Sequence, residues 1–254
     1  MPYSDAVASR MPGLSGRFPL TRGSVIAAVR DGDPEVRRQA LDTLIESYWK
    51  PVYKYLRMQW KAESEDARDL TQAFFALALE KETFGRYDPA KARFRTFLRT
   101  CLDGFAANER KAAGRLKRGG GAAALSLDFE GAEQELARQG AVESLSPEDL
   151  FHREWVRALF GLAVEDLRRR CEASGRSVHF VLFERYDLEG SGGEWPSYAE
   201  LAAEHGLTTI QVTNWLAAMR RDLRKIVLER LRDLTGSEAE LRAEAREILG
   251  IDPA

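Results

Sequence analysis

The sequence predicts an all-helical protein of two domains joined by a flexible acidic linker. Three observations lead to this fold class. Apolar residues recur at three- and four-residue spacing along most of the chain, which is the period of one helix face. No segment shows the apolar–polar alternation of a strand strongly enough to compete. The window 197–224 reads as two short helices around a tight turn.

The first domain is expected at 18–118, after a flexible polar lead at 1–17. A short helix around 24–30 comes first, and Asp33 then provides an N-cap before Pro34 at the first helical position. The apolar stripe of the next, long helix runs from Leu41 to Trp60, and Pro51 is expected to kink it.

Two further helices complete the first domain. One is predicted from about 64 to 81, and Asp66, Asp69 and Gln72 lie off its apolar face. The other begins near Ala90 after a loop at 83–89. Helical spacing favours a core position for its Phe94 and Phe97, over a role as platforms for unstacked bases.

The linker is expected at 119–145 and the second domain at 146–236. The linker opens with the triplet Gly119–Gly121 and is rich in small and acidic residues, which is typical of a flexible tether. Ser146 and Pro147 then fit the cap and first turn of a long helix, and a shorter helix covers 178–183. An extension at 237–254 carries a last amphipathic helix, to which the pattern assigns no role.

Opposite charges are segregated within a chain whose formal net charge is only −2. Ten basic and three acidic side chains lie between residues 86 and 118, whereas seven acidic residues and one basic residue lie between 126 and 150. A basic block favours a polyanionic partner. The acidic segment is a plain soluble tether, or else this segment or the acidic helix at 237–249 covers part of a DNA-binding surface in the free protein.

The chain lacks the sequence signals of membrane, secreted, disulfide-rich and metal-binding proteins. No apolar run approaches the roughly 20 residues of a membrane span, and the N-terminus lacks the apolar core of a signal peptide. Two distant cysteines make no disulfide framework, and three scattered histidines have no ligand spacing. We therefore expect a soluble cytoplasmic protein with no metal, no cofactor and no enzymatic activity.

The window 197–224 has the pattern of a helix-turn-helix. Its shared core would use Leu201, Ala202, Leu207, Val212 and Trp215, and Gly206 would supply the positive φ of the turn. Thr208 or Thr209 can cap the second helix. The candidates for DNA contact on that helix are Thr209, Gln211, Thr213, Asn214, Arg220 and Arg221, followed by Arg224 and Lys225. The alternative is an ordinary helical hairpin with a solvated basic face.

Three segments, in this order, resemble bacterial RNA polymerase sigma factors of the extracytoplasmic-function group. They read DARDLTQAFFALALEK at 66–81, YDPAKARFRTFLRTCLDGFAANERKAAGRLKR at 87–118 and SYAELAAEHGLTTIQVTNWLAAMRRDLRK at 197–225. The resemblance implies a region 2 helical bundle and a region 4 helix-turn-helix. It further implies binding to core polymerase through the beta-prime clamp and beta flap, recognition of bipartite promoter DNA, promoter melting, and an anti-sigma factor as a candidate partner.

The resemblance also assigns residues. Polymerase contacts fall on Asp66, Asp69 and Gln72. Contacts to the minus-ten DNA fall on the third helix of the first domain, at Arg95, Arg99, Asn108, Arg110, Lys111 and Arg115. The chain departs from the family in its longer, more acidic linker and in VTNWLAAM at 212–219, where groove-facing Arg, Lys or Ser is more usual.

Two other functions fit the same residues. A helix-turn-helix repressor would use its first domain for dimerisation or ligand binding and would read a palindromic site. A sigma-like interaction protein would bind polymerase or an anti-sigma factor without starting transcription. Binding to duplex DNA in the absence of core polymerase distinguishes the repressor from the other two.

Overall fold

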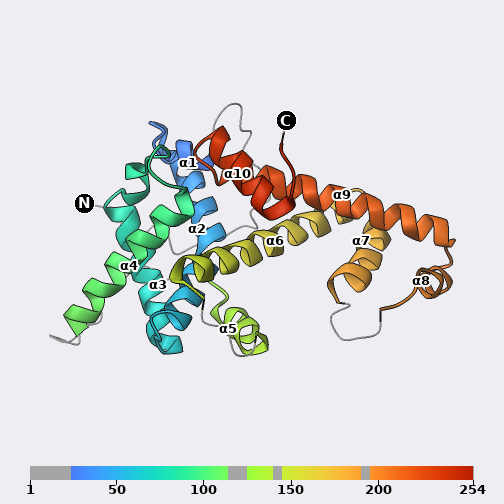
Figure 1. Cartoon of the computed structure of the whole chain (residues 1–254), viewed down its shortest axis with the longest axis horizontal. Coiled ribbons are helices and arrows are strands. Elements are labelled where there is room, and N and C mark those ends of the chain that lie inside the picture. Colours follow the sequence, from blue (N-terminus) through green and yellow to red (C-terminus); the bar gives the residue numbers. More distant parts are fainter. Residues whose placement is uncertain (1–23, 114–124, 140–144, 190–194, 254) are drawn as a thin grey trace. The chain divides into compact units, whose positions relative to one another are not determined.

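The computed structural model describes residues 24–113, 125–139, 145–189 and 195–253. Every regular element in these ranges is helical, which confirms the all-helical fold class (Figure 1). The chain divides into two compact units. Unit 1 comprises residues up to Trp155 together with Asp233–Glu240, and unit 2 comprises Val156–Arg232 with the residues from Leu241 onward.

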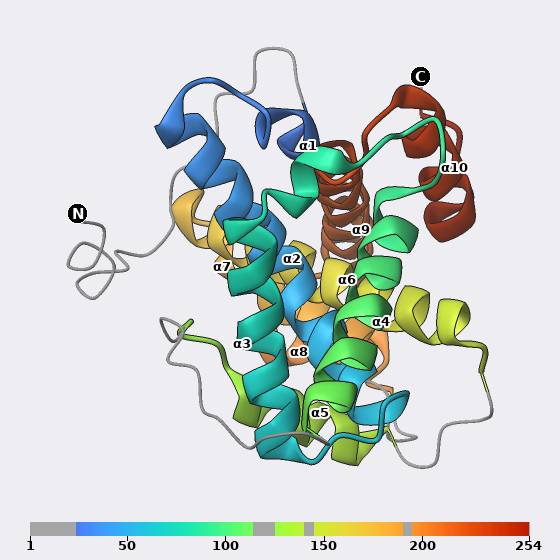
Figure 2. The same cartoon turned by 90° about the vertical axis from the view of Figure 1, so that its left-hand side faces the viewer.

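Unit 1 is built around one long helix, α2 (Pro34–Met58). Asp33 caps it as predicted, because its carboxylate accepts hydrogen bonds from the backbone amides of Glu35 and Val36, and the helix continues through Pro51. The other elements are α1 (Val25–Ala28), α3 (Ser64–Glu80), the 3-10 turn η1 (Thr83–Arg86), α4 (Phe94–Ala113), α5 (Phe129–Arg138) and the start of α6 (Pro147–Ala173). Helices α1, α3 and α5 pack against α2, and α3 also contacts α4 (Figure 2).

Aromatic side chains fill the core of unit 1. The Tyr48 ring meets Phe94 edge-on at 5.5 Å and stacks on Trp155 at 6.3 Å. Phe151 likewise packs edge-on against Tyr55. Phe94 is therefore a core residue, as its spacing predicts. These contacts also place the first turns of α6 in unit 1, whereas the sequence assigns the chain from 146 to the second domain.

The expectation of a flexible tether throughout 119–145 is wrong for α5. Phe129 is buried, with its ring 5.5 Å from Trp49 and 5.0 Å from Tyr53. The Arg57 guanidinium binds both carboxylate oxygens of Glu133, at 2.7 and 3.1 Å. This segment is ordered because one aromatic anchor and complementary charges hold it on α2. Residues 114–124 and 140–144, and with them Gly119–Gly121, lie outside the described residues, as does the lead at 1–17.

The acidic residues of α5 also reach a buried lysine. Lys54, 2% exposed, lies 2.6 Å from Glu135 and 3.4 Å from Glu154. Lys50 donates to the other oxygen of Glu135 at 2.8 Å. The acidic segment thus neutralises basic residues of α2. Within the described residues, its expected partner, the basic block at 86–118, is reached by Glu148, which pairs with Arg99 at 2.9 Å.

Helix α4 begins at Phe94, four residues later than the sequence predicts. A carboxylate from far along the chain binds the backbone at this start. Glu240, 8% exposed, accepts hydrogen bonds from the Phe94 amide at 2.7 Å and from the Tyr87 hydroxyl and the Gly236 amide. The segment at 233–240 therefore caps α4 within unit 1, whereas the sequence places residues 233–236 in the second domain and the rest in an extension without a role.

Unit 2 contains the rest of α6 and the helix-turn-helix segment. Its other elements are α7 (Ser177–Phe183), the π-helical turn η2 (Glu184–Leu188), α8 (Tyr198–His205), α9 (Thr209–Asp233) and most of α10 (Glu238–Leu249). Leu159, Leu167, Leu216 and Ile226 are 0–1% exposed in its core. Both cysteines are free thiols. None of the helices described here has the length and hydropathy to cross a membrane.

Candidate nucleic-acid interface

The turn between α8 and α9 has the geometry that the sequence predicts. Gly206 adopts φ +65°, a left-handed conformation in which a side chain would be strained. At the start of α8, Ser197 and Glu200 form a reciprocal capping box. Leu201, Ala202 and Val212 are buried between the helices. The other two expected core residues, Leu207 and Trp215, are half-buried.

A second capping box begins α9, and it changes the role expected for Gln211. The cap is Thr208, whose hydroxyl accepts from the Gln211 amide at 3.2 Å. The Gln211 carboxamide oxygen accepts in return from the Thr208 amide at 2.9 Å and from its hydroxyl at 3.0 Å. Although Gln211 is exposed, its acceptor oxygen is engaged in the cap. If this oxygen accepted a hydrogen bond from a base, it would have to give up the hydrogen bonds that cap the start of α9.

The exposed face of α9 changes from neutral to basic along the helix. Thr209, Thr213 and Asn214 are exposed near its start, and the Thr213 hydroxyl donates to the carbonyl of Thr209 at 2.8 Å. Further along, three basic side chains are exposed and have no hydrogen bond or ion pair to another described residue: Arg221, Arg224 and Lys225. This face can donate hydrogen bonds and offer positive charge to an elongated anion.

Ile210 is a member of this face that the sequence analysis missed. Its side chain is 71% exposed in the first turn of α9, more than any other large apolar residue among those described. Single exposed apolar residues are common on protein surfaces, and this one leaves a branched apolar side chain accessible at the start of α9. The sequence does place Ile210 directly between two predicted DNA contacts, Thr209 and Gln211, and this position could have identified it.

Arg220, another predicted phosphate contact, is paired within unit 2. Its guanidinium holds both carboxylate oxygens of Asp187, the shortest distance being 2.8 Å, and lies over the Tyr186 ring at 5.7 Å. The hydrogen bond to Asp187 raises the Arg220 pKa. A bidentate pair of this kind commits the side chain to joining α9 with η2. Its neighbour Arg221 faces solvent instead.

His179 supports the same helix from α7. Its imidazole stacks on Trp215, with ring centroids 3.8 Å apart and an angle of 21° between the planes. Burial lowers the His179 pKa, and the nearby Arg176 charge lowers it further. The neutral imidazole is therefore the form that suits this packing, although the histidine has no place in the predicted pattern.

Two predicted DNA contacts on α4, Arg95 and Arg99, are engaged in contacts within unit 1. Arg95 is only 7% exposed, and its guanidinium lies 5.6 Å from the Trp155 ring centre. Arg99 pairs with Asp103 at 2.8 Å and with Glu148. Their expected exposure is wrong because the face that carries both arginines is covered by the first turns of α6.

Asp103 links α4 to α2 through the same network. Its Oδ1 accepts from the Tyr55 hydroxyl at 2.9 Å and from the Trp60 indole at 3.1 Å, and Oδ2 accepts from Arg99. Burial, together with the hydrogen bond to Asp103, raises the pKa of Tyr55 to about 12. The phenol therefore stays a donor at neutral pH, and α4 is held in a fixed position on α2.

The remaining candidates of unit 1 lie on its surface. Asn108, Arg110 and Lys111 are exposed near the end of α4, and Arg115 lies outside the described residues. On α3, Asp66 and Asp69 are exposed while Gln72 is half-buried. The structure thus offers one acidic surface on α3 and one basic surface at the end of α4. An acidic first turn also favours the helix dipole, which is a purely structural reason for Asp66.

Comparison of the chain with protein-family models, with curated proteins and with solved structures found no match in any of the three. The functional argument therefore rests on the surfaces of the two units. Both basic surfaces suit phosphate, and the start of α9 presents polar and apolar side chains suited to base edges.

Proposed function

We propose that this protein is an RNA polymerase sigma factor of the extracytoplasmic-function type, working in the cytoplasm. The observation that carries the proposal is the exposed face of α9, which places Asn214 and Ile210 ahead of Arg221 in a helix-turn-helix. This order matches a recognition helix, whose first turns meet bases and whose later turns meet the backbone. The family resemblance of residues 66–81, 87–118 and 197–225 provides the second support.

Upstream promoter recognition is assigned to unit 2. Asn214 has both a donor and an acceptor for a base edge, and Ile210 suits the methyl group of thymine. Arg221, Arg224 and Lys225 would neutralise phosphates, which releases counterions and makes binding sensitive to salt. Arg220 supports the helix from within its own unit.

Polymerase binding and minus-ten recognition are assigned to unit 1. Asp66 and Asp69 offer an acidic surface to a basic clamp, in which complementary charge guides docking. Arg110 and Lys111 are the described residues of α4 that remain accessible to the minus-ten DNA. An anti-sigma factor would compete for the same two surfaces.

Transcription in vitro tests this proposal directly. The protein is mixed with core polymerase and a library of promoter fragments from a compatible genome, and transcripts are sequenced. We expect initiation at bipartite sites, loss of activity with Asp69→Lys, and retained activity with Glu80→Lys, which makes the same charge change in another exposed residue of α3. Absence of initiation from every fragment contradicts the proposal.

Footprinting of the same DNA fragments without polymerase tests the alternative function, a helix-turn-helix repressor. A sigma factor alone binds duplex promoter DNA weakly, whereas a repressor protects its site by itself. Tight footprints on palindromic DNA without core enzyme would therefore favour the repressor. Binding to core without any initiation would favour the non-initiating sigma-like protein.

A further inference from the structure

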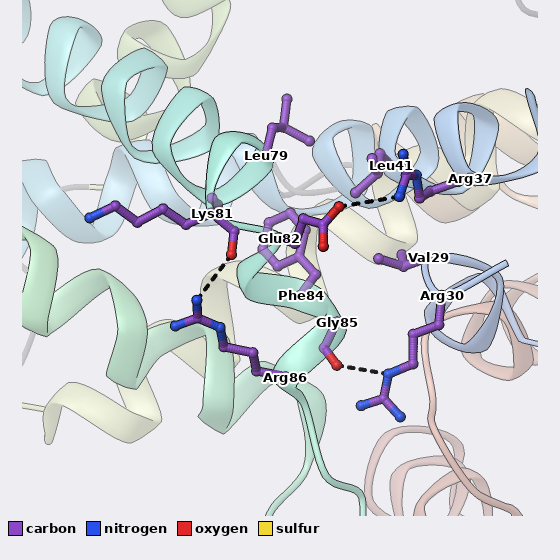
Figure 3. A pocket seen from close by; sticks show the side chains of 11 residues that line it. Val29, Arg30, Arg37, Leu41, Leu79, Lys81, Glu82, Phe84, Gly85 and Arg86 are labelled. Atoms are coloured by element: carbon purple, nitrogen blue, oxygen red, sulfur yellow. Dashed lines mark hydrogen bonds and ion pairs between the residues drawn. The ribbon is translucent and has the colours of Figure 1, made fainter. Parts of the chain in front are cut away.

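Unit 1 contains a cavity of about 450 Å³ that has no part in the proposed function (Figure 3). Its walls come from the end of α1, the first half of α2, the end of α3 and η1. The lining residues are Val29, Arg30, Arg37, Leu41, Ala78, Leu79, Lys81, Glu82, Phe84, Gly85 and Arg86. The volume lies within the range of small-molecule sites.

The lining is apolar on one side. Val29, Ala78 and Phe84 are buried at 7%, 3% and 2% exposure, and Leu41 and Leu79 are half-buried. Because Val29, Ala78 and Phe84 are almost fully covered, Leu41 and Leu79 supply the apolar surface that a ligand can reach. A ligand that covers it needs a flat or apolar part of its own.

The rim of the cavity is strongly basic. Arg30, Arg37, Lys81 and Arg86 are exposed and come from different elements, and Glu82 is the one acidic residue in the lining. The lining therefore has a formal charge of +3, and like charges gathered around one hollow raise its affinity for anions. The second part of a suitable ligand is thus a group with more than one negative charge.

Two of the arginines are already oriented by the backbone. Arg30 Nε donates to the Gly85 carbonyl at 2.8 Å, and its Nη2 donates to the Tyr87 carbonyl. Arg86 Nη2 lies 3.3 Å from the Lys81 carbonyl. A guanidinium has five N–H donors, so both side chains keep donors for an anion while their positions are fixed. Such preorganisation lowers the entropic cost of binding.

Glu82 occupies the place of an anionic ligand. Figure 3 shows its carboxylate facing Arg37, with which it pairs at 3.2 Å. The pair is weak because the two side chains are 45% and 73% exposed. Glu82 also adopts φ +47°, a left-handed conformation that is costly for a residue with a side chain. Its position directly after the C-cap of α3 accounts for this conformation, because helices commonly end with one left-handed residue.

We propose that this cavity binds a nucleoside phosphate. The base covers the half-buried Leu41 and Leu79, and the phosphate takes the place of the Glu82 carboxylate at Arg37 and also contacts Arg86. Guanidinium groups suit phosphate because they bind it with paired hydrogen bonds. This site is separate from the polymerase and DNA surfaces, so the proposal does not depend on the proposed function.

Titration calorimetry with ADP and the full chain tests the proposal, with no DNA or polymerase present. We expect saturable binding at low salt that weakens about tenfold in Arg37→Ala and in Arg86→Ala, since each removes a charged hydrogen bond. Arg38→Ala is the matched control, because it removes the same charge one residue away on α2, outside the cavity. Glu82→Gln should strengthen binding, because it removes the competing anion.

Two smaller probes identify what is recognised. Adenosine should bind at least about tenfold more weakly than ADP, since it lacks the charged group, and inorganic phosphate should also bind more weakly, since it leaves the apolar surface uncovered. Phosphate binding as tightly as ADP would overturn the nucleoside part. No saturable binding of ADP, or an equal loss in Arg38→Ala, would overturn the site itself. Circular dichroism confirms that each variant is folded.

Discussion

At the scale of single residues, His179 couples the packing of α7 on α9 to pH. Its pKa is lowered in the folded protein, so the unfolded chain binds a proton more readily. The contribution of His179 to stability is therefore fully present above its unfolded pKa of about 6.5 and is lost as the pH falls toward the folded pKa. Thermal unfolding of unit 2 should occur at a lower temperature at about pH 5.5 than at about pH 7.5.

The variant His179→Gln separates this effect from other titrations. Ordinary carboxylates titrate near pH 4, below the chosen window, and should contribute little there. We expect His179→Gln to be less stable than the parent at about pH 7.5, through loss of the ring stacking, and to show a smaller change between the two pH values. An unchanged pH dependence would assign it to another group.

Arg221 and Asn214 should have different effects on promoter binding, although both are exposed on α9. Arg221→Ala should weaken binding of the holoenzyme to all sequences and reduce the slope of the salt dependence by about one. Asn214→Ala should instead change which bases are selected, because its carboxamide is suited to a base edge. Selection from a randomised upstream element measures both. The same selected sequence from Asn214→Ala and the parent would contradict this docking of α9.

At the scale of elements, the packing of α5 on α2 through their ion pairs should stabilise unit 1. Glu135→Gln removes a charge from the buried Lys54, which keeps Glu154 as its only carboxylate partner among the described residues. We expect a loss of about 1–3 kcal/mol in the free energy of unfolding, because a buried ammonium loses a charged hydrogen bond. Glu130→Gln, on the exposed side of α5, should cost far less. Chemical denaturation measures both variants. Equal free energies of unfolding for Glu135→Gln and Glu130→Gln would contradict a stabilising role of the ion pair between Glu135 and Lys54.

The cap of α4 by Glu240 gives a second prediction for an element. Glu240→Gln keeps the size of the side chain but removes the charge that faces the first turn of α4. We expect a loss of about 1–2 kcal/mol in the stability of unit 1. Glu238→Gln is the control, since that residue is exposed in the same helix. Hydrogen exchange at the start of α4 should increase in Glu240→Gln alone, and no change there would rule out the cap.

These contacts also show which elements a sequence can predict. Local signals were sufficient for α2 and for the turn at Gly206, because Asp33, Pro34 and the glycine act on their own neighbours. The packed α5 and the Glu240 cap depend on partners about 80 and 146 residues away, which no local pattern contains. Periodicity likewise placed both Arg95 and Arg110 on α4 but could not tell which of them α6 would cover.

At the scale of the whole molecule, the proposed function requires the two units to bind one promoter together. A second contact made by the same complex is favoured by a high effective concentration, so a promoter with both elements should bind much more tightly than one with either element alone. Inserting about five base pairs between the elements turns one of them by half a helical turn relative to the other. We expect this insertion to reduce open-complex formation to nearly the level of a promoter without its upstream element.

Variants of the two units provide the control for this prediction. On the parent promoter, Arg221→Ala in unit 2 should weaken open-complex formation. On the promoter with the insertion, the same change should have little further effect, because the contact has already been lost. Lys111→Ala in unit 1 should weaken open-complex formation equally on both promoters, since the minus-ten contact does not depend on the spacing between the elements. Permanganate footprinting of the melted strand measures each combination, and an equal effect of Arg221→Ala on both promoters would show that unit 2 does not read a spaced upstream element.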